Sequence, residues 1–328
     1  MTIEKKLPVL SDIQAARKIL RGVVHLTPIC ESSSISYMAG MKILFKCENL
    51  QRCGSFKIRG AYTKLSSLGP EERKKGVAAY SSGNHALGVA FAAKLLEMKA
   101  TIFMPENVAE VKLKGVKAYG AKAVLVGTTS EERMNAALKF SEKTGAVLVP
   151  PFDDPKIIAG QGTLGLEILE QVPDAKRIVV PIGGGGLISG ISIAVKSIKK
   201  EVEIVGVEPE LAPKMSRSLE AGEIVKTVPG ETVADGLKPV SPGKLTFEAV
   251  KRYVDRVVTV KDKDIIMATK LIMERAKLVV EPSGAVPLAA CLSKAVENNK
   301  EKTVLVISGG NIDFEMFFKR KEEGHEGR

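Results

Sequence analysis

The segment RIVVPIGGGGLISGISIAVKSI, residues 177–198, joins a short apolar strand to an apolar helix through four consecutive glycines. The first six residues are rich in β-branched side chains, and the part after the glycines carries apolar residues at helical spacing. Glycines let the backbone approach a ligand closely, and the N–H groups that open the following helix favour an anion. Gly183 to Gly186 therefore predict the site of a single phosphate group, with a tight turn that binds nothing as the alternative.

Two better-known phosphate loops do not fit these glycines. A G-x-G-x-x-G fingerprint needs a glycine five residues after the first, but that position holds Ile188 counted from Gly183 and Ser189 counted from Gly184. The Lys-Ser/Thr pair of a P-loop is also missing. Because Glu208 follows at a strand end, as a ribose-binding acid would, a nicotinamide dehydrogenase stays open. A non-catalytic regulator that binds a phosphate stays open as well.

Outward from this segment, short apolar strands alternate with helical stretches. This alternation predicts parallel sheets and an α/β fold, with ligands at the carboxyl ends of the strands. Nine strands exceed one small sheet, so we expect two lobes: a small one at residues 76–149, inserted in a large one made of residues 1–75 and 150–328. The expected strands are residues 42–48, 76–81, 100–105, 122–127, 146–151, 177–182, 203–209, 256–260 and 303–308.

The composition excludes several classes of protein. Of the 328 residues, 45% are hydrophobic and 27% are charged, which is typical of a globular protein. The net charge of +11 comes from scattered lysines, and 5% aromatic residues without Trp give few base-stacking platforms, so we expect no nucleic-acid partner. The chain lacks a membrane-spanning run and a signal-peptide core. Without C-x-x-C pairs or clustered histidines, we predict no zinc site and a reducing, cytoplasmic compartment.

A second motif is YSSGNHALG, residues 80–88, which follows an expected strand and opens an expected helix. Ser81, Ser82, Asn84 and His85 stand where the helix begins. Such donors at a helix N-terminus either hold a carboxylate or simply cap the helix.

Two further motifs carry an amine and a hydroxyl. In SFKIRGA, residues 55–61, Lys57 stands at a helix start with few counter-charges, which predicts a lowered pKa and suits imine chemistry; an ordinary surface lysine is the alternative. In TVLVISGGN, residues 303–311, Ser308 ends a strand before two glycines that admit a flat ring, or that simply form a turn. A phosphate loop, an amine, a carboxylate seat and a strand-end hydroxyl together are what a pyridoxal phosphate enzyme acting on an amino acid needs.

The order of these motifs resembles that of the threonine dehydratases and serine racemases, which are fold-type II (tryptophan synthase β-like) pyridoxal phosphate enzymes. The resemblance runs from about residue 10 to residue 314. It rests on SFKIRGA, SSGNHALG, GGGGLISG, VADGL, LTFEAVKRYVD, VEPSGAVPLAA and ISGGN. It implies a two-lobed α/β subunit, assembled as a homodimer or homotetramer, with the cofactor between its lobes.

The resemblance also implies a role for each site residue. Lys57 would hold the cofactor as a Schiff base, with Phe56 packed against it. Asn84 would bond the 3′-oxygen of the cofactor, and Ser308 would face its pyridine nitrogen. The phosphate would be held by Gly183, Gly184, Gly185, Gly186 and Leu187. The substrate carboxylate would be held by Ser81, Ser82, Asn84 and His85.

Two activities of this family are open for the chain. The activity we expect is that of a dehydratase, which converts L-threonine or L-serine to a 2-keto acid and ammonia by β-elimination, with Lys57 removing the Cα proton. The alternative is a serine racemase with dehydratase side activity. Racemisation needs a second proton donor on the face opposite the lysine, and racemases have a serine at the position of Ser82. Arg133 resembles an arginine that racemases place near the substrate carboxylate. Otherwise Ser82 is a helix cap and Arg133 a surface residue.

In one place the chain departs from its relatives. Racemases often bind Mg²⁺ or Ca²⁺ through a glutamate, a backbone carbonyl and an aspartate; here Glu208 and Ala212 match, but Lys214 replaces the aspartate. Because an ammonium group cannot ligate a cation, we expect no metal there and an ion pair between Lys214 and Glu208 instead.

Overall fold

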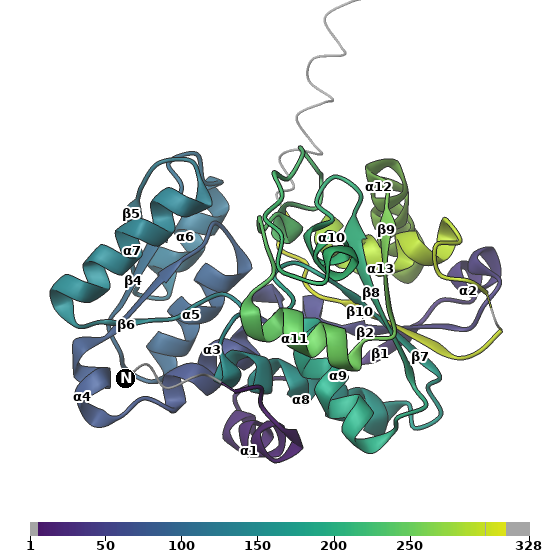
Figure 1. The fold of residues 1–328 in the computed structure, drawn as a ribbon, viewed down its shortest axis with the longest axis horizontal. Coiled ribbons are helices and arrows are strands. Elements are labelled where there is room, and N and C mark those ends of the chain that lie inside the picture. Colours follow the sequence, from purple (N-terminus) through teal and green to yellow (C-terminus); the bar gives the residue numbers. More distant parts are fainter. Residues whose placement is uncertain (1–5, 299, 313–328) are drawn as a thin grey trace, which may run out of the picture.

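The computed structural model describes residues 6–298 and 300–312, whose strands form two sheets (Figure 1). The larger sheet has the order β1-β2-β10-β7-β8-β9, and every strand is parallel to its neighbours except β1, which is antiparallel to β2. Its strands are β1 (Ile29–Glu31), β2 (Ile43–Cys47), β7 (Arg177–Pro181), β8 (Glu203–Pro209), β9 (Arg256–Val260) and β10 (Thr303–Ile307). The predicted α/β class is confirmed.

The smaller sheet is entirely parallel and has the order β5-β4-β3-β6. Its strands are β3 (Val77–Tyr80), β4 (Ala100–Met104), β5 (Lys122–Leu125) and β6 (Val147–Leu148). All four strands fall within residues 76–149, which we propose as the small domain, with residues 1–75 and 150–328 as the large one.

Helices cover both faces of each sheet. They are α1 (Leu10–Leu20), α2 (Ser33–Ala39), α3 (Lys57–Ser66), α4 (Pro70–Lys75), α5 (Asn84–Leu95), α6 (Glu110–Ala118), α7 (Ser130–Thr144), α8 (Pro155–Gln171), α9 (Gly186–Ile198), α10 (Lys214–Ala221), α11 (Lys244–Tyr253), α12 (Asp262–Leu271) and α13 (Pro282–Leu292), with the single turns η1 (Glu48–Leu50), η2 (Arg52–Gly54), η3 (Asp235–Leu237) and η4 (Ile272–Ala276). On the large sheet, α2, α12 and α13 cover one face, and α8 to α11 cover the other. On the small sheet, α3, α5 and α6 cover one face and α7 the other.

Local signals in the sequence set the ends of two of these helices. Thr129 caps α7 by accepting a hydrogen bond from Glu132 N at 3.3 Å, and Gly145 ends that helix at φ +72°. Asp154 caps α8 in the same way, because its Oδ1 accepts from the backbone N–H of Lys156 at 2.9 Å. The Asp–Pro pair at 154–155 therefore starts the helix, with Asp154 as the cap and Pro155 as the first helical residue.

Helix α8 lies buried between α3 and α9 (Figure 1), and glycines bring the three backbones together. A Cβ on Gly190 of α9 would lie 2.4 Å from the backbone N of Gly162 in α8. A Cβ on Gly160 would lie 2.6 Å from the carbonyl oxygen of Arg59 in α3. Because side chains cannot fit at these crossings, the position of α3 is fixed rigidly relative to the large sheet.

A buried cluster of four charges fixes the same helix. The guanidinium of Arg59 donates to Glu48 at 2.8 Å and to Glu167 at 2.7 Å, and Lys46 Nζ donates to Glu167 at 2.7 Å. All four side chains are buried, and two cations balance two anions, as buried charges require. The cluster ties α3 to β2, η1 and α8.

None of the described helices is long and apolar enough to cross a bilayer.

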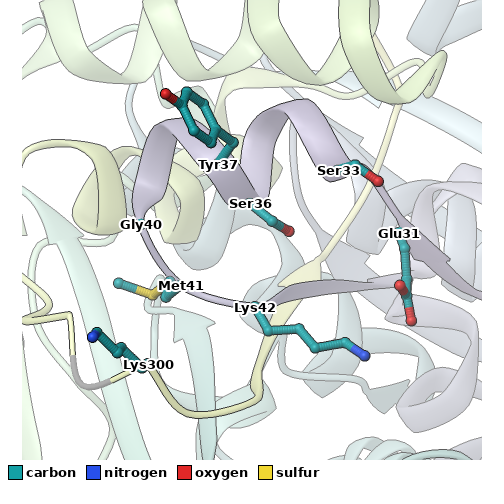
Figure 2. Close-up of a pocket in the computed structure, with 8 residues that line it drawn as sticks. All are labelled: Glu31, Ser33, Ser36, Tyr37, Gly40, Met41, Lys42 and Lys300. Carbon is teal, nitrogen blue, oxygen red and sulfur yellow. The ribbon is translucent and has the colours of Figure 1, made fainter.

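The surface of the large lobe has a shallow hollow (Figure 2). It is lined by Glu31, Ser33, Ser36, Tyr37, Gly40, Met41, Lys42 and Lys300. Lys42 and Lys300 precede β2 and β10, so the hollow lies at the amino ends of these strands, whereas ligands of parallel sheets bind at the carboxyl ends.

Candidate active site

Backbone hydrogen bonds hold the segment before α3 against the carboxyl end of β10. The N–H of Phe56 donates to the carbonyl oxygen of Ser308 at 3.1 Å, and the N–H of Gly310 donates to Gly54 O at 2.9 Å. Ser55 forms an isolated antiparallel bridge with Gly309 between them. The structure therefore brings the two sequence motifs together, with Lys57 in the first turn of α3 next to the end of β10.

The amine of Lys57 is half-buried and has a carbonyl partner. Its Nζ donates to the backbone oxygen of Pro151 at 2.9 Å and lies 5.2 Å from the centre of the Phe56 ring. Burial lowers the pKa of Lys57 to about 8, although the charge of Glu281 acts in the opposite direction. A substantial fraction of this amine is therefore neutral near physiological pH, which a nucleophile or a general base requires.

The glycine loop after β7 is closely packed between two neighbouring segments. A Cβ on Gly184 would lie 2.1 Å from the ring of Phe152, and one on Gly186 would lie 3.0 Å from Phe152 Cβ. Gly185 has φ +96°, which favours glycine, and Thr246 Oγ1 donates to Gly184 O at 2.7 Å. The loop leads directly into α9, so backbone N–H groups at the start of a helix are available to a small anion.

The side chain of Leu187, the fifth residue predicted for the phosphate, is 4% exposed and belongs to the hydrophobic core under the large sheet. Only its backbone N–H is thus suited to an anion. Ser308, at the end of β10, is also buried.

The turn between β3 and α5 contains the residues predicted for a carboxylate. Ser81 Oγ accepts a hydrogen bond from Gly83 N at 3.2 Å, and Ser82 is half-buried. His85 is buried, and its Nε2 lies 3.0 Å from Val149 O. Because a carbonyl oxygen only accepts, Nε2 carries the proton. Burial and the charge of Lys57 lower the pKa of His85 to about 3, so the ring is neutral.

The side-chain amide of Asn84 joins the two lobes. Its Nδ2 donates to Glu281 Oε1 at 2.6 Å, and its Oδ1 accepts from Asn311 Nδ2 at 2.8 Å. Burial raises the pKa of Glu281 to about 7. A Cβ on Gly309 would lie 2.5 Å from Glu281 Oε1, so this position must be small. Our sequence analysis missed Glu281 and Asn311; the signal for both was their place in the VEPSG and SGGN motifs.

Two cations of the small lobe are placed differently from each other. The guanidinium of Arg133 donates to Thr128 O at 3.1 Å and to Ser130 Oγ at 3.0 Å, which are groups at the start of its own helix α7. Lys112 of α6, which the sequence analysis did not single out, reaches across to Asp235 of η3 in the large lobe, with Nζ 3.3 Å from Oδ2.

Known proteins are similar to this chain in sequence and in fold. A model of the pyridoxal-phosphate dependent enzyme family matches residues 20–310. The chain belongs to this family. The L-threonine ammonia-lyase of Thermotoga maritima is 50% identical to it over 307 residues, which cover 94% of this chain and 76% of the relative. The serine racemase of Dictyostelium discoideum is 41% identical over 314 residues, which cover 94% and 97%. The structure of maize serine racemase matches with a TM-score of 0.91 and 40% identity, over 97% of this chain and 99% of that one.

The residues at this site fit the cofactor of a pyridoxal-phosphate dependent enzyme. The glycine loop leads directly into α9 and presents backbone N–H groups at the start of that helix, which suits the phosphate. Lys57 supplies a half-buried amine with a lowered pKa, which suits attachment of an aldehyde. The predicted family, fold class and cofactor, pyridoxal phosphate, are confirmed.

At the place where the resemblance to racemases implies a metal site, the structure shows a lysine. The Nζ of Lys214 lies 2.9 Å from Glu208 Oε1, and it also donates to the carbonyl oxygens of Ile182, Ala212 and Leu237 at 3.0, 3.2 and 3.0 Å. Both charged side chains are fully buried. The ammonium group thus stands among oxygen atoms of the kind that ligate Mg²⁺ or Ca²⁺.

Proposed function

We propose that the chain is a pyridoxal phosphate-dependent threonine ammonia-lyase, which converts L-threonine or L-serine to a 2-keto acid and ammonia by β-elimination of the hydroxyl. The observation that carries the proposal is the half-buried, weakly basic amine of Lys57, held next to the glycine loop and the end of β10. The 50% identity to an L-threonine ammonia-lyase supports the choice of substrate.

Each residue has a role in holding the cofactor. The backbone N–H groups of Gly183 to Leu187 would bind its phosphate, and Phe56 would pack against its ring. Ser308 would face the pyridine nitrogen, and Asn84 would donate to the 3′-oxygen. Lys57 would hold the cofactor covalently. When bound, pyridoxal phosphate supplies an electron sink for the electron pair left when a proton leaves Cα.

Lys57 also moves the proton. When its Nζ is free and neutral, Lys57 would accept the Cα proton of the substrate as a general base. Its hydrogen bond to Pro151 O, 2.9 Å long, holds the amine in place, and burial keeps its pKa near 8, so that the base is not permanently protonated. The hydroxyls of Ser81 and Ser82, and the backbone N–H groups of Asn84 and His85 at the start of α5, donate hydrogen bonds to the substrate carboxylate.

Racemisation is the second candidate function. Ser82 is half-buried in the turn that leads to α5, and it is the residue we propose as a proton donor on the face opposite Lys57. The 41% identity to a serine racemase and the likeness to the maize serine racemase structure favour this reading. Arg133 gives this second function less direct support, because its guanidinium already donates to Thr128 O and Ser130 Oγ at the start of α7.

One experiment separates these functions. The purified protein is expected to be yellow and to lose that absorbance on borohydride reduction, with Lys57 labelled. L-threonine, L-serine and D-serine are then supplied in turn, and 2-keto acid and the chirality of the remaining amino acid are measured. Keto acid from the L-substrates supports the lyase; D-serine formed from L-serine, and lost in Ser82→Ala, supports the racemase. A colourless, unlabelled protein contradicts both.

We also propose that the enzyme is a cytoplasmic homodimer or homotetramer. Apolar side chains are exposed on two helices that pack on the same face of the large sheet: Tyr37 and Met38 of α2, and Ile266 and Met267 of α12. All four cysteines are unpaired in the described structure, which suits a reducing compartment. Light scattering during size-exclusion chromatography tests the assembly.

We further propose that no divalent metal binds at Glu208, since Lys214 occupies that place.

A further inference from the structure

The proposed binding site for the substrate carboxylate, here called the carboxylate seat, consists of Ser81, Ser82, Asn84 and His85. It contains hydrogen-bond donors but no cation. His85 is neutral, because burial and the charge of Lys57 lower its pKa to about 3. Both ends of the Asn84 amide already have partners in the large lobe. Arg133 is bonded to the start of its own helix. An amino acid brings a full negative charge to this seat, and a half-buried carboxylate is bound best when a cation neutralises it.

Lys112 is the cation that stands beside this seat. Its Nζ lies 3.6 Å from the position that a Cβ on Gly83 would take, and its Cε lies 3.9 Å from the same position. Gly83 is the residue that caps α5, so the ammonium group lies next to the N–H groups at the start of that helix. The Lys112 side chain is only 19% exposed, although it comes from a surface helix.

The partner that Lys112 has in this structure is easily replaced. Its Nζ lies 3.3 Å from Asp235 Oδ2, which is longer than the 2.7–2.9 Å typical of a charge-assisted hydrogen bond. The Asp235 side chain is 63% exposed, so water solvates it when the lysine leaves. An ion pair with so exposed a partner contributes little stability.

We propose that Lys112 is the residue that neutralises the substrate carboxylate, and that it exchanges Asp235 for that carboxylate when the amino acid binds. The inference rests on the proposed function and adds a residue that selects for α-amino acids with a free carboxylate. Asp235 acts as a stand-in anion that holds the lysine between the lobes until the substrate arrives.

The proposed exchange predicts different effects on the KM when Lys112 and when Asp235 is replaced. In the holoenzyme, Lys112→Met should raise the KM and the Kd for L-threonine at least about tenfold, because a charge-assisted contact is lost. Lys112→Arg should restore most of this loss. Asp235→Asn should leave the KM unchanged or lower it, because the lysine no longer has a competing anion. Lys114→Met, which removes a lysine 73% exposed on the same helix, is the matched control and should change neither value.

A second measurement isolates the carboxylate. Binding of L-threonine and of L-threonine amide is followed through the cofactor absorbance, and Lys112→Met should weaken binding of the acid but change binding of the amide less than about twofold. Equal losses for acid and amide, or an equally raised KM in Asp235→Asn, overturn the proposal and leave Lys112 as a structural link between lobes. Failure of the wild type to form any 2-keto acid overturns the proposed function instead, while the acid-to-amide comparison still decides the role of Lys112. If L-threonine does not bind the wild type at all, both are overturned.

Discussion

The side-chain amide of Asn84 donates to Glu281 Oε1 at 2.6 Å, and this hydrogen bond connects the start of α5 in the small lobe to the residue before α13 in the large lobe. Burial raises the pKa of Glu281 to about 7, so the carboxyl is partly protonated at neutral pH. The contact between the lobes therefore depends on a group that titrates in the physiological range.

Glu281→Gln is expected to change how stability depends on pH. A folded-state pKa of about 7 against an ordinary 4.5 means that folding favours the protonated form. The stability that the protonated Glu281 carboxyl contributes to the fold is complete below about pH 4.5 and is lost as the pH rises to about 7. Glutamine keeps the acceptor for Asn84 but never ionises, so the variant should gain about 1–3 kcal/mol relative to wild type between pH 5 and pH 8. Urea unfolding of both apoproteins at pH 5 and at pH 8 measures this gain in the free energy of unfolding. The same difference between variant and wild type at both pH values would contradict the prediction.

The attachment of the cofactor to Lys57 should follow the lowered pKa of this amine. The neutral form attacks the aldehyde, and it predominates above about pH 8 rather than above the ordinary 10.5. The rate at which apoprotein acquires the cofactor absorbance should therefore rise with pH to a midpoint near 8 and then level off. A simple alkyl amine measured in parallel serves as the control. A rate that keeps climbing to pH 10 would show that burial does not set this pKa.

The sequence predicted those parts of the site that local patterns encode. Lys57, Ser308 and the glycines 183–186 each stand at the end of a strand or the start of a helix, and both kinds of boundary leave a local signature of apolar periodicity and small residues. The nine strands were predicted for the same reason. In contrast, β1 (Ile29–Glu31) is too short to show alternation, and its pairing with β2 depends on residues farther along the chain.

The contacts between the lobes could not be predicted in this way. Asn84 and Glu281 are 197 residues apart, and Lys112 and Asp235 are 123 residues apart. Their pairing depends on how the two lobes pack, which no local pattern contains. The packing of α3 on the small sheet is a similar case, since its position follows from buried charges and glycine crossings distributed over several elements.

Gly88→Ala should impair the enzyme without unfolding it. A Cβ at this position in α5 would lie 3.1 Å from both the carbonyl carbon and the Cβ of Lys57, so the alanine pushes α5 away from the catalytic lysine. Alanine favours a helix over glycine by about 1 kcal/mol, which offsets part of the crowding. We expect kcat/KM to fall at least about tenfold, since small misplacements of a reacting group are costly. Gly115→Ala on α6 is the control, because the only group it meets is the flexible end of Leu87. Equal kinetics for the two variants would contradict the prediction.

The ion pair of Lys214 and Glu208 makes a prediction about metals. Lys214→Met leaves the carboxylate buried without its cation and should cost about 3–5 kcal/mol of folding free energy. Lys214→Asp instead creates a second carboxylate facing the carbonyl oxygens of Ala212 and its neighbours, an oxygen-rich site suited to Mg²⁺ or Ca²⁺. The Tm of this variant should rise when millimolar Mg²⁺ is added and fall with EDTA, whereas the activity and Tm of the wild type should respond to neither. Inactivation of the wild type by EDTA, reversed by Mg²⁺, would show that the lysine does not replace the metal.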